Sequence, residues 1–166
     1  MPSFQRILVA TDGTPACARA FETAVELARG LGASLVTLSV APGPTEAAVG
    51  GASDPLGGAE EAIAALERHD PVAARAAASA QAQAAAAQAT AVGVDATWRV
   101  WEGSPGDAII AAATAERADL IVVGSHCRGA VGRLIAGSVS EHVVRHAQIP
   151  VMVVRPAGSP KPVPAG

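Results

Sequence analysis

The sequence predicts a single α/β domain, an open parallel β-sheet with helices on both faces. Short apolar runs alternate with helical segments and are joined by short loops, a pattern typical of parallel sheets. The 166 residues are enough for one well-filled core. They are too few for an eight-stranded barrel, which needs about 250 residues. An open sandwich is therefore the architecture that fits this length.

Five apolar runs, rich in Val, Ile and Leu, are expected to form the strands. Continuous apolar runs of this length are typical of strands buried on both faces. They cover residues 7–10, 34–40, 96–101, 120–123 and 151–154. Side chains alternate along a strand, so Trp98 and Trp101 in the third run point to opposite faces. We expect one tryptophan in the core and the other at the surface or in an interface.

The first helix is expected directly after the first strand. Thr14 is a suitable capping residue, and Pro15 suits the first helical position. The helix ends at Gly30 and Gly32, and its expected apolar face consists of Phe21, Val25, Leu27 and Leu31.

A loop rich in Pro, Gly, Ser and Ala is expected at residues 42–58, after the second strand. The following segment, about 60–90, is composed mostly of Ala, Gln, Arg and Glu and is expected to be helical. Its first part, 60–67, is predicted as a separate turn, because Pro71 interrupts the segment.

Two more helices are expected in the second half of the chain. One covers roughly 105–116, where Ser104 is the expected cap, Pro105 takes the first helical position and Asp107 follows in the first turn. The other covers 138–146, between the fourth and fifth strands.

Composition excludes several classes of function. The net charge is -3, and the twelve Lys and Arg residues are scattered, so nucleic-acid binding is not expected. The alanine-rich segment 73–92 is interrupted by Arg75 and several Gln, so no membrane span is expected. The first six residues do not resemble a signal peptide, and two distant cysteines, Cys17 and Cys127, make no disulfide framework. A cytoplasmic protein with two ordinary thiols is expected.

Polar and small residues follow two of the expected strands, where ligands of open parallel sheets bind. Asp12 follows the first strand, and a loop from Gly124 to Gly137 and Ser138 follows the fourth. Backbone N–H groups of such a loop and of the next helix suit phosphates. Asp12 could accept hydrogen bonds from a ribose or an adenine amino group, or cap the helix at Thr14. Ser138 could likewise bind phosphate or cap its own helix.

At several places the sequence resembles the universal stress protein family, and together they span about residues 4–155. These places are Val9-Ala10-Thr11-Asp12-Gly13-Thr14, Gly124-Ser125-His126, Gly137-Ser138-Val139-Ser140-Glu141 and Pro150-Val151-Met152-Val153-Val154. A universal stress protein domain is therefore expected at 1–155, followed by a disordered, proline-rich tail at 156–166. The resemblance implies a sheet in the order 3-2-1-4-5, of the adenine nucleotide alpha-hydrolase-like type, and a homodimer joined through strand 151–154.

The ATP-binding branch of this family carries Gly-x2-Gly-x9-Gly followed by Ser or Thr. The pattern falls on Gly124, Cys127, Gly137 and Ser138, with Cys127 in place of the second glycine. The resemblance implies that these residues and Val139 hold the phosphates of ATP or a related adenine nucleotide, with Mg²⁺ as a companion. It also implies that adenine and ribose are surrounded by Ala10, Asp12 and Val40.

Other functions remain open beside ATP binding in a stress-response role. Cys127 favours the branch that does not bind nucleotide, a dimer acting through protein partners. A nucleotide-dependent ligase is a third possibility, but no general base or γ-phosphate lysine is visible, so at most slow ATP hydrolysis is expected. Dinucleotide and P-loop fingerprints are absent from the sequence. His142 and His146 have metal-ligand spacing on a helix, without an apparent third ligand.

Overall fold

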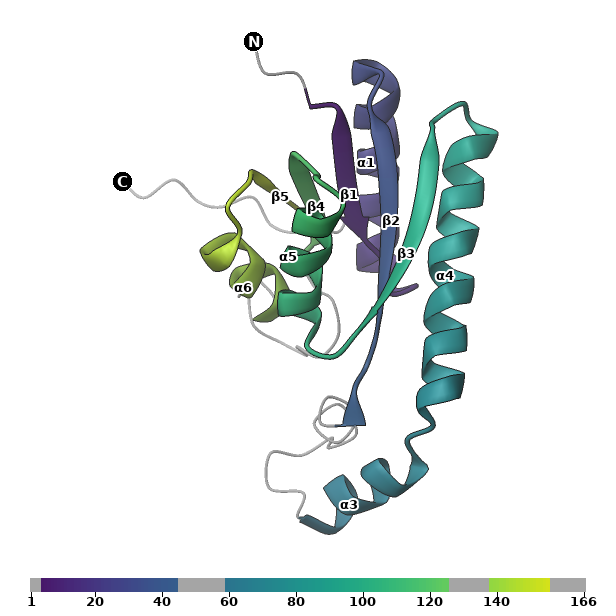
Figure 1. Cartoon of the computed structure of the whole chain (residues 1–166), viewed down its shortest axis with the longest axis vertical. Coiled ribbons are helices and arrows are strands. Elements are labelled where there is room, and N and C mark those ends of the chain that lie inside the picture. Colours follow the sequence, from purple (N-terminus) through teal and green to yellow (C-terminus); the bar gives the residue numbers. More distant parts are fainter. Residues whose placement is uncertain (1–3, 45–58, 126–137, 156–166) are drawn as a thin grey trace.

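The computed structural model describes residues 4–44, 59–125 and 138–155 and contains a five-stranded sheet (Figure 1). The strands are β1 (Arg6–Ala10), β2 (Ser34–Ala41), β3 (Ala96–Glu102), β4 (Leu120–Gly124) and β5 (Val151–Val154). Their order is β3-β2-β1-β4-β5, and every neighbouring pair is parallel. The predicted fold class and strand order are confirmed. The expected tail, 156–166, lies outside the described residues, as does most of the loop 42–58.

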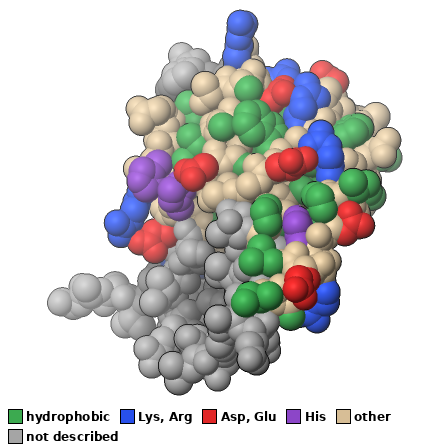
Figure 2. Space-filling model, turned by 60° about the horizontal axis from the view of Figure 1, so that its bottom comes forward, with side chains coloured by type: hydrophobic (Ala, Val, Ile, Leu, Met, Phe, Trp, Pro, Cys, Tyr) green, Lys and Arg blue, Asp and Glu red, His purple; other side chains and the backbone are tan. Residues whose placement is uncertain are grey.

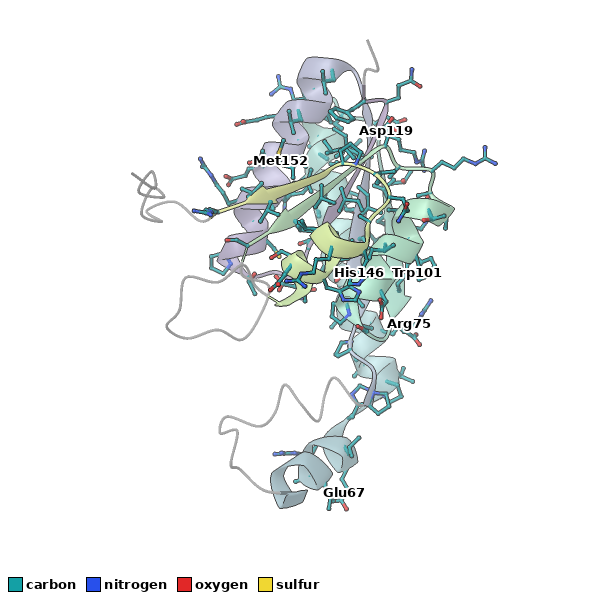
Figure 3. All side chains as sticks on the ribbon, turned by 90° about the vertical axis from the view of Figure 1, so that its left-hand side faces the viewer. Glu67, Arg75, Trp101, Asp119, His146 and Met152 are labelled. Atoms are coloured by element: carbon teal, nitrogen blue, oxygen red, sulfur yellow. The ribbon has the colours of Figure 1, made fainter. Side chains whose placement is uncertain are left out.

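The helices agree with the expected segments to within one or two residues. They are α1 (Pro15–Leu31), α3 (Ala59–Arg68), α4 (Pro71–Ala91), α5 (Pro105–Ala115) and α6 (Ser138–His146). The predicted break before Pro71 is present, because Asp70 caps α4 by accepting hydrogen bonds from the N–H groups of Val72 and Ala73. Residues 60–67, predicted as a turn, belong instead to the α-helix α3. In Figure 1, α3 extends away from the sheet below α4, and Glu67 marks it in Figure 3. None of the described helices is long and apolar enough to cross a membrane.

The sheet has a separate apolar cluster on each face. On one face, α1 packs on β1 and β4 and α4 packs on β2 and β3, and Ile7, Val9 and Val122 are fully buried there. On the other face, α5 and α6 cover the sheet, and Ile109 and Val143 pack against its residues. The expectation of helices on both faces is confirmed.

The expected apolar face of α1 is only partly correct. The positions that face the sheet are Cys17, Ala20, Ala24 and Ala28, all 1% exposed or less. Phe21, Val25 and Leu27 lie beside this stripe and are partly buried. Leu31 was placed on the apolar face but is 45% exposed. Small side chains let the helix backbone approach the sheet closely, so the larger ones flank the contact.

Of the two expected helix caps, Thr14 makes a capping hydrogen bond and Ser104 does not. Thr14 accepts a hydrogen bond from the Cys17 N–H at 3.4 Å, so this cap is confirmed. Ser104 has the extended backbone of a capping residue, but its hydroxyl makes no capping hydrogen bond. Ser104 thus takes the expected cap position without the expected hydrogen bond, and the Asp107 carboxylate in the first turn pairs with His142.

As expected, one tryptophan of β3 is exposed and the other packs against the core. Trp98 is 39% exposed on the edge strand β3. Trp101 packs against the apolar cluster beneath α5 and α6.

A charged cluster joins three elements around Glu116, at the end of α5. The Glu116 carboxylate is 13% exposed and accepts hydrogen bonds from Arg6 at 2.7 Å and from Arg99. Burial alone raises the pKa of Glu116, but the hydrogen bonds and charges of the two arginines outweigh it, so its pKa lies below the ordinary value.

Glu116 is expected to stabilise the fold in a pH-dependent way. Because its pKa is lowered in the folded state, its contribution is present above the ordinary carboxylate pKa and is lost as the pH falls through the folded-state value. Thermal unfolding should show a lower Tm for Glu116→Gln at neutral pH and a smaller difference from the wild type in acid. Glu102→Gln is the matched control, because its pair with Arg75 is exposed and contributes little. An equal Tm difference at every pH would contradict this.

Candidate functional site

The turn after β1 places the Asp12 side chain at the carboxyl end of the sheet. Asp12 Oδ1 accepts two hydrogen bonds from Thr14, from the backbone N–H at 2.8 Å and from the hydroxyl at 2.6 Å. Gly13 between them has a φ of 76°, a conformation that residues with side chains rarely adopt. The local role of Asp12, holding the capping residue Thr14, is thus present in the structure. None of the described residues donates to its other oxygen, Oδ2.

The end of β4 lies beside the end of β1, because the two strands are parallel neighbours. Gly124 is the last residue of β4. Next to it, Ser125 is 4% exposed, and its N–H donates to the carbonyl of Val154 at 2.8 Å. The exit of β1 is also tied to β2, since the N–H of Thr11 donates to the carbonyl of Leu38 at 2.8 Å. Asp12 and Gly124 therefore lie next to each other's strands at the carboxyl end of the sheet.

Three of the expected nucleotide-site residues share one apolar cluster. Ala10 is 6% exposed within it, and Val40 and Val139 pack against it from β2 and from the first turn of α6. All three therefore lie on the same face of the sheet, with Ala10 and Val40 at or next to the carboxyl ends of β1 and β2. Ser138 is the first residue of α6. Cys127 and Gly137 lie outside the described residues.

One polar contact at this end of the sheet was not anticipated from the sequence. Ser39, on β2, is 2% exposed, and its hydroxyl donates to Gln81 Oε1 on α4 at 3.1 Å. The sequence holds a signal for it, since Thr37 and Ser39 stand two apart in an otherwise apolar strand. Alternating polar residues in a buried strand need hydrogen-bond partners on the helix above them, and the hydroxyl of Thr37 donates to the carbonyl of Ala82.

The two histidines considered for metal binding form a different cluster. His142 Nε2 lies 2.7 Å from Asp107 Oδ1, and His146 Nδ1 lies 2.8 Å from the carbonyl oxygen of His142. Their rings are 4.3 Å apart between centroids. Figure 2 shows histidine side chains gathered beside acidic ones on the left of the face, and Figure 3 labels His146 on α6. No three potential metal-ligand side chains are arranged to hold an ion within the described part of the chain.

A shallow depression of about 420 Å³ lies elsewhere, between the start of α4 and the end of β3. It is lined by Pro71, Val72, Arg75, Ala76, Ser79 and Glu102, none of which belongs to the expected nucleotide site. The ion pair between Arg75 and Glu102 spans these two elements.

Comparison with known protein families identifies the family of this chain. The model of the universal stress protein family matches residues 3–155. The chain belongs to the universal stress protein family. The resemblance seen in the sequence is confirmed.

Curated universal stress proteins and a stress response protein are similar to the chain in sequence. The stress response protein NhaX of Bacillus subtilis is 31% identical over 167 aligned positions, which cover 90% of this chain and 97% of NhaX. A universal stress protein of Thermus aquaticus is 52% identical over 54 residues, or 32% of this chain. That second match spans only 39% of the Thermus protein.

Solved universal stress protein structures share the fold over nearly the whole chain. The protein from Lactobacillus plantarum matches with a TM-score of 0.72 at 24% identity, over 93% of this chain and all of its own. A universal stress protein in complex with cAMP matches with a TM-score of 0.62 at 24% identity, over 94% and 100% of the two chains. A universal stress protein from Archaeoglobus fulgidus in complex with dAMP matches with a TM-score of 0.57 at 20% identity. The match covers 92% of this chain and 99% of that protein. At these identities the likeness establishes the fold.

Proposed function

We propose that this universal stress protein binds ATP or a related adenine nucleotide and acts through it in regulating a stress response. Asp12, Ala10 and Val40 contact the nucleoside. The phosphates bind to backbone N–H groups after β4 and at the start of α6. The phosphate residues are Gly124, Cys127, Gly137, Ser138 and Val139.

The observation that carries this proposal is the convergence at the carboxyl ends of the strands. Asp12 and Gly124 lie at the carboxyl ends of neighbouring parallel strands, and Ala10, Val40 and Val139 belong to the apolar cluster on one face of the sheet. Ligands of open parallel sheets bind at this edge. Structures with the same fold include complexes with cAMP and dAMP, which supports an adenine nucleotide as the ligand class.

The first turn of α6 suits a phosphate, because the N–H groups at a helix N-terminus have no partner within the helix. Mg²⁺ is expected to arrive bound to the phosphates, because the residues assigned to the site include no carboxylate besides Asp12, which contacts the nucleoside. We expect hydrolysis to be slow at most, because the residues assigned to the site include no general base and no lysine. The protein would then respond to the nucleotide as a ligand.

Dimerisation through β5 is part of the same proposal. β5 is an edge strand made of Val151, Met152, Val153 and Val154, all partly buried within the subunit. An apolar edge strand favours pairing with a second chain. We place the homodimer in the cytoplasm. The alternative function, a dimer that binds protein partners without nucleotide, rests on Cys127 in the phosphate pattern.

Calorimetric titration of Mg-ATP into nucleotide-stripped protein tests the proposal. We expect saturable binding of about one nucleotide per subunit. Absence of heat at millimolar nucleotide, repeated at a second temperature, would contradict nucleotide binding and favour the protein-partner alternative. Sedimentation of the same sample tests the dimer, and Val153→Lys on β5 should shift a dimer to monomer.

A further inference from the structure

The side of α4 that faces the sheet is built almost entirely from alanine. Its buried residues are Ala78, Ala82, Ala85, Ala86 and Ala89. Gln81 interrupts this surface, since it is half-buried next to Ala82, whereas Gln83 and Gln88 on the same helix are exposed. A polar side chain in such a contact costs free energy unless it is hydrogen-bonded. Gln81 therefore needs a structural or functional reason to be there.

The amide of Gln81 joins two segments at the carboxyl end of the sheet. Its oxygen accepts the hydrogen bond from the hydroxyl of Ser39. Its nitrogen lies against the turn after β1, because a Cβ placed on Gly13 would be 3.2 Å from Nε2 and 3.6 Å from Cδ. With the amide oxygen on Ser39, the amide nitrogen faces Gly13.

Gly13 is the central residue of the turn in which Asp12 Oδ1 holds the N–H and hydroxyl of Thr14. With a φ of 76°, Gly13 is the most permissive residue of this turn, and its other conformations would reorient Asp12. The Gln81 amide occupies the space into which a side chain at Gly13 would point, and we infer that it restricts that freedom. Ser39, Gln81 and Gly13 thus form a chain of contacts from β2 through α4 to Asp12.

We propose that Gln81 is a positioning residue of the nucleotide site, acting on Asp12 through the Gly13 turn. This inference rests on the proposed function, in which Asp12 contacts the nucleoside. Gln81 should affect binding of the nucleoside, because Asp12 is assigned to that part of the ligand. The residues assigned to the phosphates lie elsewhere, after β4 and at the start of α6. Loss of the Gln81 amide should weaken binding of the nucleoside and leave phosphate binding unchanged.

Amide hydrogen exchange at Thr14 tests the effect on the turn without any ligand. Gln81→Met keeps the volume and helix propensity but removes both polar ends, and Ser39→Ala deletes only the hydroxyl partner. In both variants we expect the Thr14 N–H, which donates to Asp12, to exchange about fivefold faster. Gln83→Met is the matched control on the exposed side of α4 and should leave the rate unchanged. Unchanged exchange in both test variants would overturn the inference.

Two ligands then separate positioning from general loosening. In Gln81→Met we expect the Kd for ATP to rise about fivefold, while the Kd for inorganic tripolyphosphate stays as in the wild type. An equal loss for both ligands, or no loss for ATP, would overturn the positioning role while nucleotide binding itself stands. If the wild type binds no nucleotide, the proposed function and the site role of Gln81 both fail. The exchange rates then show separately whether Gln81 restrains the turn.

Discussion

Asp12→Asn is expected to weaken ATP binding by at least about tenfold while the fold remains intact. Asparagine has the shape of aspartate and keeps one oxygen, so it can still accept from the N–H and hydroxyl of Thr14. The second oxygen becomes an NH₂ group, which donates and cannot accept from a ribose hydroxyl or an adenine amino group. Hydrogen bonds to charged groups contribute roughly 1.5–3 kcal/mol, which corresponds to about 10- to 100-fold in Kd.

The chain offers a matched control for this substitution. Asp70 also accepts hydrogen bonds from the backbone just after it, from the N–H groups of Val72 and Ala73, but it lies at the start of α4. Asp70→Asn should leave the Kd for ATP unchanged. Titration calorimetry gives the affinities, and thermal unfolding shows whether the two variants are equally stable. If Asp12→Asn bound ATP as tightly as the wild type, Asp12 would have only its local role of holding Thr14.

The regular elements could be predicted because the signals for them are local. Each strand is a short apolar run and each helix has a proline, glycine or capping residue near an end, so the observed bounds differ little from the expected ones. What failed depends on packing between elements. The buried stripe of α1 consists of Cys17 and alanines rather than the larger residues, because hydrophobicity alone does not show how closely a helix approaches a sheet. Asp107 likewise pairs with His142, 35 positions away.

In the candidate site, too, some residues could be predicted from local signals and others depend on packing. Asp12 and Gly124 could be placed at one edge because the carboxyl ends of neighbouring parallel strands coincide, and the order of strands came from the family resemblance. Gln81 could not be found, since its role depends on which face of a long alanine-rich helix meets β2. The phosphate assignments at Cys127 and Gly137 remain predictions from the glycine pattern.

Gly106→Ala is expected to destabilise the fold by about 2 kcal/mol, within the range for overpacking a buried contact. Gly106 is buried in the first turn of α5, and a Cβ there would lie 2.6 Å from Cδ2 and 2.9 Å from Cγ of His142. The imidazole would have to swing away, which breaks its contact with Asp107 and disturbs the packing of α6 on α5. Urea unfolding of the purified variant measures the loss.

A double-mutant cycle separates this steric cause from the loss of a flexible glycine. In a His142→Ala background the ring is gone and the added methyl group meets only the Cβ at position 142, 3.2 Å away, so Gly106→Ala should cost much less there. Gly30→Ala is the control for a helix glycine without a steric neighbour. Nothing lies within 4 Å of the position that its Cβ would take in α1. That change should stabilise the fold by about 0.5–1 kcal/mol. Equal destabilisation by Gly106→Ala in both backgrounds would mean that the backbone of α5, rather than His142, requires the glycine. Since α6 begins at Ser138, the single variant should also weaken nucleotide binding if the start of that helix holds the phosphates.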